Sequence, residues 1–339
     1  RLGVRAAFTA AVQNEMSGGL SKDEEAIYDR QLRVWGVEAQ QRMRNSKVLV
    51  LGSCGAAIEV AKNLILAGIG LLHLVDDRTV GPDATLAGNF LVPATPEVVG
   101  TSVAERCAEG LREMNPLVDV SCETTDAKGY VERAGDEQLG QYSAVLAFDM
   151  PATTVRAIDE RCASLNIPLC ACTSRGVGGW IFLNPQRHEY IVETSAEDDK
   201  TGEVKKTVEH KSMTGVGFVD VVEEMVARSS EAAAAERANP RRRKRRSALF
   251  DVVARSLAYE LETGRSVSVG DAERLKGEGQ GEVDACLADY LEGACVPAVL
   301  AVLGGVLAND VIKLVSKKGA LGIDRMFCYS VLDDAGWIM

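Results

Sequence analysis

The chain has 339 residues, of which 46% are hydrophobic and 26% are charged. That length allows a large buried core, arranged as one α/β domain or as two smaller ones. The net charge is -11 at pH 7 although residues 241–246 are all basic, so most of the surface is expected to repel nucleic acids and anionic membranes.

The cysteines and histidines predict neither disulfides nor a metal site. The chain has nine cysteines and three histidines, and no cysteines are spaced as C-x-x-C. We expect buried, reduced thiols in an intracellular protein. We expect no bound metal, because structural zinc needs clustered cysteines or histidines. The longest apolar stretch, residues 296–308, is shorter than the ~20 residues of a membrane span and predicts a core helix.

Residues 1–20 are predicted to be a disordered extension. The extension begins with two arginines and few acids, a pattern that weakly resembles a transit peptide. The alternative is sequence upstream of a start at Met16.

A β-α-β unit is predicted next, after a helical segment at residues 21–45 in which Ser21 and Glu24 form a capping box. Apolar runs at 48–51 and 71–75 predict buried parallel strands on either side of a helix. The alternation continues with an expected helix at 101–114, strands at 118–123 and 144–148, a helix at 153–165 and a strand at 168–172.

The sheet is expected to finish in antiparallel strands. GWIFL at 179–183 and HEYIV at 188–192 are joined by turn residues and predict a hairpin. The polar, alanine-rich segment that follows shows no strand pattern and predicts a flexible linker. The predicted units are therefore the extension 1–20, a Rossmann-like domain 21–194, the linker 195–247, a helical insertion 248–293 and a return to the main fold at 294–339.

The turn after the first strand is typical of a nucleotide-binding unit. Gly52 and Gly55 precede a helix whose N–H groups suit a phosphate, and Asp76 follows the next strand, where an acid can accept from a ribose hydroxyl. Ala57 stands at the third expected glycine, where alanine is tolerated in helix packing. From these residues alone a nucleotide site and a packing role both remain open. A nicotinamide-dependent oxidoreductase has less support, because no hydride-transfer constellation is evident downstream.

Four segments carry a resemblance to a known family, namely YDRQLRVWG at 28–36, EVAKNLILAGIG at 59–70, TSRGVGGWIFL at 173–183 and VLGGVLANDVIKLVS at 302–316. The chain resembles the ubiquitin-type activating enzymes, whose adenylation domains are related to the ThiF/MoeB adenylyltransferases. The resemblance implies a Rossmann-like α/β fold of that type, with a mostly parallel sheet that ends in antiparallel strands. The length and the missing C-x-x-C pair favour the small subunits of the heterodimeric SUMO-activating enzymes. The alternatives are the small subunits of the NEDD-modifier activating enzymes and self-sufficient ThiF/MoeB-like adenylyltransferases.

The same resemblance implies that the chemistry takes place in a partner. The large subunit binds ATP and magnesium, joins AMP to the carboxyl-terminal glycine of the SUMO modifier, and passes the acyl group to its own cysteine. This chain is expected to supply Arg30 in trans as an arginine finger, because a preorganised guanidinium stabilises charge that develops on the phosphates. Arg33 is expected to support it. The alternative for Arg30 is a salt bridge within its own helix.

The resemblance also implies that the local nucleotide site has been lost. Active relatives carry Asn-x-Asn-Arg-Gln-Phe where this chain has residues 85–90, and Gly88 replaces the arginine. Glycine offers a phosphate neither a charge nor a side-chain donor. We therefore expect no cofactor to be bound by this chain, and we regard Gly52, Gly55, Asp76 and Asp149 as remnants of the site.

Two further residues are expected to be structural. Asp149 matches an aspartate that handles magnesium in active relatives, but its phosphate partners are missing, so we expect it to cap the following helix. Cys172 lies in an apolar run, so its thiol is expected to be buried and inert. No thioester is therefore expected on this chain.

The basic run at residues 241–246 predicts a nuclear import signal on the linker. The expected location is the nucleus, with some protein in the cytoplasm. A solvated charge cluster and a nonspecific contact with polyanions are the alternatives.

Overall fold

The computed structural model describes residues 20–81, 88–93, 95–197, 204–238, 248–276, 281–293, 295–332 and 335–339. The predicted extension at 1–20 therefore lies outside the described residues except for Leu20. The basic run at 241–246 also lies outside them.

One eight-stranded sheet forms the centre of the molecule, in the order β10-β9-β6-β5-β4-β1-β2-β3. The parallel strands are β1 (Lys47–Leu51), β2 (Leu71–Val75), β3 (Asp119–Glu123), β4 (Ala144–Phe148) and β5 (Leu169–Arg175). The antiparallel strands are β6 (Gly178–Asn184), β9 (Met326–Ser330) and β10 (Ala335–Ile338). A mostly parallel sheet that ends in antiparallel strands is confirmed.

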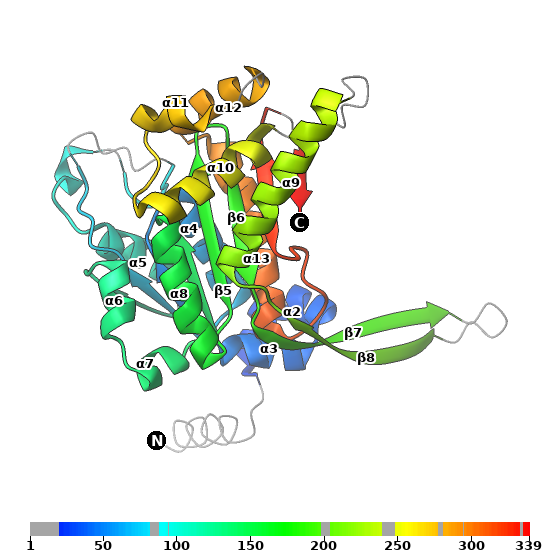
Figure 1. The fold of residues 1–339 in the computed structure, drawn as a ribbon. Coiled ribbons are helices and arrows are strands. Elements are labelled where there is room, and N and C mark those ends of the chain that lie inside the picture. Colours follow the sequence, from blue (N-terminus) through cyan, green and yellow to red (C-terminus); the bar gives the residue numbers. More distant parts are fainter. Residues whose placement is uncertain are drawn as a thin grey trace, which may run out of the picture.

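Helices cover both faces of the sheet (Figure 1). They are α2 (Lys22–Trp35), α3 (Val37–Arg44), α4 (Gly55–Ala67), α5 (Val103–Met114), α6 (Ala127–Arg133), α7 (Asp136–Gly140), α8 (Ala152–Leu165), α9 (Phe218–Ala238), α10 (Ala248–Thr263), α11 (Ala272–Leu275), α12 (Gly281–Glu292) and α13 (Pro297–Ser316). Helices α4, α5 and α13 bury their apolar side chains in the core on one face. Helices α6 to α10, together with α12, form the core on the other face. The central strands β1 and β4 are buried on both sides, which is why they have continuous apolar sequences.

Helix α13 is the apolar helix predicted to lie in the core. By length and composition alone it could cross a membrane. It packs instead against α4, so closely that a Cβ atom at Gly304 would lie 2.4 Å from the Cβ of Glu59. Its buried leucines and valines belong to the same core as the first β-α-β unit. The prediction of a core helix is confirmed.

The predicted hairpin between GWIFL and HEYIV is wrong. Strand β6, which contains GWIFL, lies between β5 and β9, and all its residues are buried. HEYIV belongs to β7 (Arg187–Glu197), which pairs with β8 (Val204–Thr214) in a separate two-stranded sheet that projects from the body (Figure 1). Residues 185–186 connect the two strands, and the N–H of Gln186 donates to Oδ1 of Asn184 at 3.0 Å. A polar strand does not continue a sheet whose neighbouring strands are buried on both faces.

The expectation that residues 195–247 lack regular structure is also wrong. They contain β8 and the helix α9. Phe218, Val221, Val222 and Met225 are buried at the i, i+3, i+4, i+7 spacing of a helix face. The N–H of Phe218 donates to Oδ2 of Asp159 at 2.8 Å. This apolar stripe was obscured in the sequence by the charged and alanine-rich residues around it.

The amino-terminal segment forms two helices that pack at the carboxyl-terminal end of α4. The predicted capping box is present, since the N–H of Glu24 donates to Oγ of Ser21 at 3.2 Å and the N–H of Ser21 donates to Oε2 of Glu24 at 2.7 Å. Helix α2 ends at Gly36, whose φ of 82° favours glycine. Tyr28 is buried against Gly68, which ends α4 in a left-handed conformation.

The contact between Tyr28 and Gly68 predicts a position that cannot carry a side chain. A Cβ atom at Gly68 would lie 2.5 Å from the Tyr28 ring, at a backbone φ of 82°. We expect Gly68→Ala to lower the free energy of unfolding by about 2 kcal/mol or more, as measured by urea unfolding followed by circular dichroism.

The control is Gly305→Ala, because Gly305 lies within α13 with no atom within 4 Å of an added Cβ. That change is expected to be neutral or to stabilise by up to about 1 kcal/mol. Equal destabilisation by both substitutions would contradict the proposed role of the Tyr28 contact.

Candidate functional site

The predicted nucleotide cradle forms at the carboxyl end of the parallel sheet. Gly52 follows β1 with a φ of 88°, and a Cβ atom there would lie 2.9 Å from the carbonyl oxygen of Phe148. Gly55 is the first residue of α4, and Ala57 is buried within that helix. Asp76 follows β2 and Asp149 follows β4, the two strands that flank β1. The structure therefore brings Gly52, Gly55, Asp76 and Asp149 to the same edge, where α/β sheets bind ligands.

The carboxylate of Asp76 is already fully engaged by its own chain. Its Oδ2 accepts from the N–H of Ser53 at 2.7 Å and from Nη2 of Arg78 at 2.7 Å. Its Oδ1 accepts from the N–H and from Nε of Arg78 at 2.9 and 3.0 Å. Burial would raise the pKa of Asp76, but the hydrogen bonds and charge of Arg78 outweigh it and hold that pKa below its ordinary value. The sequence interpretation overlooked Arg78, although an arginine two residues after the expected ribose ligand was visible.

The loop that carries Gly88 packs against helix α13, and the backbone of Gly88 favours glycine. Gly88 has a φ of 78°, and an added Cβ would lie 2.2 Å from Cδ1 of Leu300 in the first turn of α13. Nδ2 of the buried Asn89 donates to the carbonyl of Ser53 at 2.8 Å. Residues 85–87 of the matched stretch lie outside the described residues. Asn89 thus connects this loop to the glycine turn after β1, and Leu300 connects it to α13.

Asp149 does not cap the following helix, so that expectation is wrong. The N-cap position of α8 is held by Pro151, and the N–H of Ala152 donates to Oε2 of Glu260 from α10 at 2.9 Å. Asp149 instead accepts through Oδ1 from the N–H of Ser174 at 3.2 Å. A carboxylate distant in sequence has taken over the capping role, which no local pattern could reveal.

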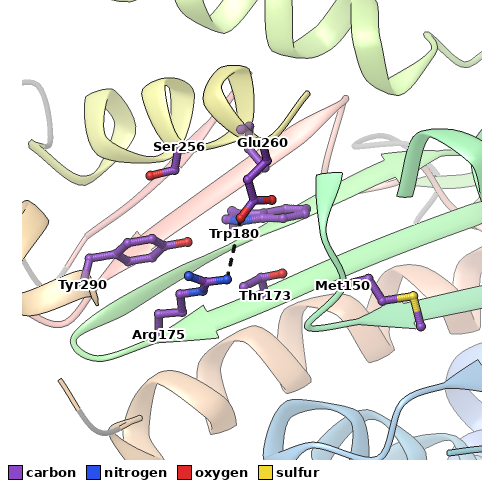
Figure 2. A pocket seen from close by; sticks show the side chains of 8 residues that line it. Met150, Thr173, Arg175, Trp180, Ser256, Glu260 and Tyr290 are labelled. Atoms are coloured by element: carbon purple, nitrogen blue, oxygen red, sulfur yellow. Dashed lines mark ion pairs between the residues drawn. The ribbon is translucent and has the colours of Figure 1, made fainter. Parts of the chain in front are cut away.

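Glu260 and Arg175 connect the helical insertion to the sheet next to the cradle (Figure 2). Nη2 of Arg175 lies 3.7 Å from Oε1 of Glu260, and Nη1 of Arg175 donates to the carbonyl of Val267 at 3.0 Å. The cavity beside them has a volume of about 10 Å³, roughly the space of one water molecule. This cavity is too small for a nucleotide.

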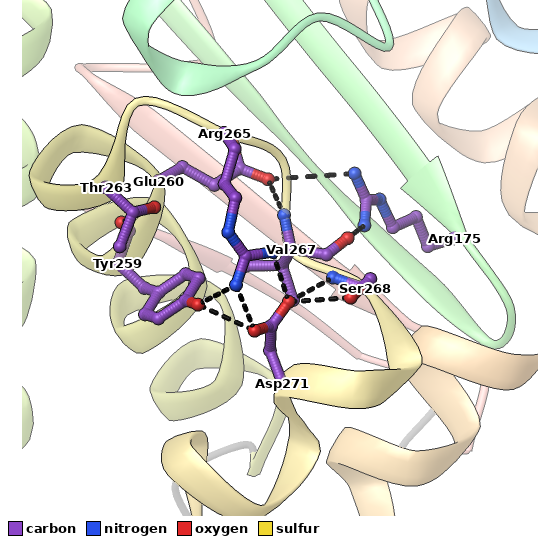
Figure 3. A network of polar contacts seen from close by, with 8 residues as sticks. All are labelled: Arg175, Tyr259, Glu260, Thr263, Arg265, Val267, Ser268 and Asp271. Carbon is purple, nitrogen blue, oxygen red and sulfur yellow. Dashed lines mark hydrogen bonds and ion pairs between the residues drawn. The ribbon is translucent and has the colours of Figure 1, made fainter.

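A second set of contacts holds the loop after α10 (Figure 3). The carboxylate of Asp271 accepts from Nη1 of Arg265 at 2.9 Å, from the Tyr259 hydroxyl at 2.6 Å and from the Ser268 hydroxyl at 2.7 Å. The N–H of Val267 donates to Glu260 at 2.9 Å. The helical insertion predicted at 248–293 is thereby fixed above the carboxyl end of β5.

The cysteines beside the cradle are buried thiols. Burial, and secondly the charge of Asp149, raise the pKa of both Cys54 and Cys172 well above the ordinary value. The predicted burial of Cys172 is confirmed. Across the described residues, no group of three or more histidine, cysteine or acidic side chains is arranged to hold a metal ion.

Arg30 lies at the opposite end of the molecule from the cradle. Its helix α2 contacts the carboxyl-terminal ends of α4 and α5, since Nε2 of Gln31 donates to the carbonyl of Leu66 at 3.0 Å and Nδ2 of Asn115 donates to the Tyr28 hydroxyl at 2.9 Å. The cradle is at the other end of α4, a helix of 13 residues and therefore ~20 Å long. An arginine side chain cannot span that distance, so Arg30 does not reach the cradle of its own chain.

Arg30 is exposed, and it has no ion-pair partner among the residues that the structure describes. The residues three and four positions away along α2 are Ala26, Ile27, Arg33 and Val34, none of them acidic, so the helix offers Arg30 no partner. Arg33 differs, because its Nη2 lies 2.9 Å from Oδ2 of Asp29. The alternative of a salt bridge within the helix is therefore wrong for Arg30. The sequence already showed this, because no acid lies three or four residues from Arg30, and the interpretation overlooked that spacing.

Comparison with known proteins identifies the family to which this sequence belongs. The sequence matches the ThiF family over residues 28–336. SUMO-activating enzyme subunit 1B-1 of Arabidopsis thaliana is 30% identical over 336 residues, which cover 94% of this chain and 96% of that protein. SUMO-activating enzyme subunit 1 of Homo sapiens is 35% identical over 197 residues, which cover 58% of this chain and 54% of that protein.

A solved structure shares the fold. The crystal structure of E. coli MccB with MccA-N7isoASN superposes with a TM-score of 0.54 and 15% identity, covering 94% of this chain and 72% of that chain. Identity at that level supports the fold alone. The family match, by contrast, spans both the α2 segment that carries Arg30 and the glycine turn after β1. The chain therefore belongs to the ThiF family and, within it, to the small subunits of the SUMO-activating enzymes.

Proposed function

We propose that this chain is the subunit of a heterodimeric SUMO-activating enzyme that does not bind nucleotide. The large subunit binds ATP and magnesium, adenylates the carboxyl-terminal glycine of SUMO and carries the thioester. Arg30 of this chain acts in trans as an arginine finger at the partner's nucleotide. The observation that carries the proposal is an exposed, unpaired guanidinium held on a rigid helix at the end of the molecule remote from its own cradle.

Three features of the local cradle support the proposal that it holds no nucleotide. The carboxylate that would accept from a ribose hydroxyl is held by Arg78 and by the N–H of Ser53. Arg78 is cationic, but its guanidinium is committed to Asp76. Gly88 stands where active relatives have a phosphate-binding arginine, and Leu300 packs against it. We therefore assign no step of the reaction to this cradle.

Two further proposals concern Arg33 and the basic run at residues 241–246. Arg33 supports the finger by its positive charge while Asp29 orients its side chain at 2.9 Å. The basic run at 241–246 acts as a nuclear import signal.

The function is tested by ATP–pyrophosphate exchange in the presence of SUMO. We expect exchange by this chain together with its large subunit and none by either this chain alone or its homodimer. In the assembled pair, Arg30→Ala is expected to slow adenylation by about 10²–10³-fold, the usual cost of removing a preorganised donor from a developing negative charge.

Arg106→Ala is the matched control, because Arg106 is a partly exposed helical arginine that is paired with Glu109 at 3.0 Å. It should change the rate by less than about twofold. Exchange by the isolated chain would favour a self-sufficient adenylyltransferase, and an unaltered rate in Arg30→Ala would remove Arg30 from the mechanism. Full activity with the NEDD modifier and none with SUMO would assign the chain to the other heterodimer.

The pair formed by Asp76 and Arg78 predicts a pH-dependent contribution to stability. Arg78→Leu is expected to lower the free energy of unfolding at pH 7 by about 1–3 kcal/mol, because it leaves a buried carboxylate without its cation while water still reaches the half-exposed Arg78 position. Since the pair lowers the pKa of Asp76 below 3.8, its stabilisation is present above that pH and is lost as the pH falls through the lowered value.

Urea unfolding of wild type and Arg78→Leu between pH 7 and pH 3 measures this effect. The difference between the two proteins should shrink toward the acidic end. Arg78→Lys, which keeps the charge without the bidentate geometry, should fall between them. A difference that stays constant with pH would show that Asp76 is not the group stabilised by Arg78.

The cysteines of this chain are expected to carry no thioester. Seven of the nine are buried, and Cys122 and Cys295 are partly buried. Burial raises the pKa of Cys295, which disfavours the thiolate nucleophile. After reaction of the pair with SUMO and ATP, a nonreducing gel should show a reductant-sensitive adduct on the large subunit alone. Such an adduct on this chain would contradict the assignment.

A further inference from the structure

The helical insertion meets the sheet at a small polar cavity (Figure 2). Thr173 and Arg175 come from β5, where a spacing of two residues places both side chains on the same face of the strand. Ser256 and Glu260 come from α10, where a spacing of four residues places them on one side of the helix. All four residues line the cavity, whose volume is about 10 Å³. One strand face and one helix face therefore supply its polar groups.

Two hydroxyl groups of this lining are buried without a partner. Thr173 and Ser256 are each only 4% exposed. Neither Oγ1 of Thr173 nor Oγ of Ser256 has a hydrogen-bond partner among the residues that the structure describes. A buried hydroxyl that makes no hydrogen bond is destabilising because its hydration is lost without compensation, and buried polar groups nearly always have partners. Two such groups on one cavity point to a molecule that bonds both.

The ion pair on the same cavity is too long for a direct hydrogen bond. Nη2 of Arg175 lies 3.7 Å from Oε1 of Glu260, beyond the usual limit of such a bond. Both side chains contact Val267 directly, since Nη1 of Arg175 donates to its carbonyl at 3.0 Å and its N–H donates to Oε1 of Glu260 at 2.9 Å. A separation above ~3.5 Å between two polar groups is typical of a contact bridged by water.

We propose that this cavity is a binding site for one ordered water molecule, which joins Thr173, Ser256, Arg175 and Glu260. The volume fits, since a cavity needs ~10–15 Å³ and two to four polar partners to hold a water. The water accepts from Nη2 of Arg175 and from one hydroxyl, and it donates to Glu260 and to the other hydroxyl. The charge of Arg175 disfavours a cation at this site, and the volume excludes a larger ligand.

The bound water fixes the orientation of the helical insertion. Oε2 of Glu260 accepts from the N–H of Ala152 at the start of α8, so the hydrated site connects β5, α8 and α10. A buried polar network whose members are all satisfied specifies one arrangement of the elements around it. This role belongs to the fold of the chain and does not depend on which subunit binds nucleotide.

Stability measurements distinguish a hydrated cavity from a dry one by the sign of the effect. Thr173→Val and Ser256→Ala each remove one hydroxyl with little change of shape. If the water is bound, each substitution should lower the folding equilibrium constant of the full chain by about three- to tenfold, because the water loses a partner. In a dry cavity each would remove an unsatisfied hydroxyl, so unchanged or higher stability would overturn the proposal. Urea unfolding followed by circular dichroism measures the change.

The double variant tests whether the two hydroxyls share one water. Its loss should be smaller than the product of the two single losses, because both hydroxyls act through the same molecule. Fully multiplicative losses would contradict a shared water. The control is Thr263→Val at the end of α10, whose exposed hydroxyl donates to the carbonyl of Tyr259 at 2.8 Å. It should change the folding equilibrium constant by about twofold or less.

A crystal structure of the full chain that resolves ordered water tests the site directly. We expect a density peak ~2.7–3.2 Å from both Oγ1 of Thr173 and Oγ of Ser256, and a weaker or missing peak in the double variant. A wild-type structure without the peak, in which Arg175 and Glu260 are in direct contact, would overturn the proposal. A peak with several oxygen ligands at ~2.4 Å would indicate a cation and would also overturn it.

Discussion

The packing of Tyr28 against Gly68 is the constraint on which the arrangement of this chain depends. Gly68 must have a left-handed backbone to end α4, and the absence of a side chain there is what admits the Tyr28 ring. Asn115 satisfies the buried Tyr28 hydroxyl. This contact places α2 at the carboxyl-terminal end of α4, so it fixes Arg30 on the far side of the molecule from the glycine turn. A helix that packed at the other end would have brought Arg30 to its own cradle.

The cradle illustrates how a nucleotide-binding shape persists when a buried carboxylate finds its partners within the protein. The glycine turn still has its unusual backbone because β4 lies directly behind it. The buried carboxylate of Asp76 is satisfied by Arg78 and by the N–H of Ser53, so this charge is not left unpaired. Leu300 from α13 occupies the space beside Gly88. Stability is thereby maintained without a ligand, which is consistent with a subunit whose chemistry lies elsewhere.

Much of the fold was predictable because its elements have local signals. Continuous apolar runs marked β1, β4 and β5, the capping box marked the start of α2, and Gly68 marked the end of α4. Strand partners were less predictable. GWIFL and HEYIV were expected to pair, but β6, which contains GWIFL, pairs with β5 and β9. The apolar side chains of β6 are buried on both faces, which suits a strand in the interior of the sheet. Helix α9 was missed because its four apolar anchors are separated by charged and small residues that resemble a linker.

The sequence by itself determined the chemical groups that are available. It provides a glycine turn, an acid after β2, a glycine where active relatives have a phosphate-binding arginine, and an Arg30 with no acid three or four residues away. Only the tertiary structure decided where they meet. It brought Glu260 across 108 positions to cap α8 and separated Arg30 from the cradle by the length of α4. The physical reason is that helical spacing and strand burial are local properties, whereas a buried polar group takes the nearest partner in space, wherever that partner lies in the chain.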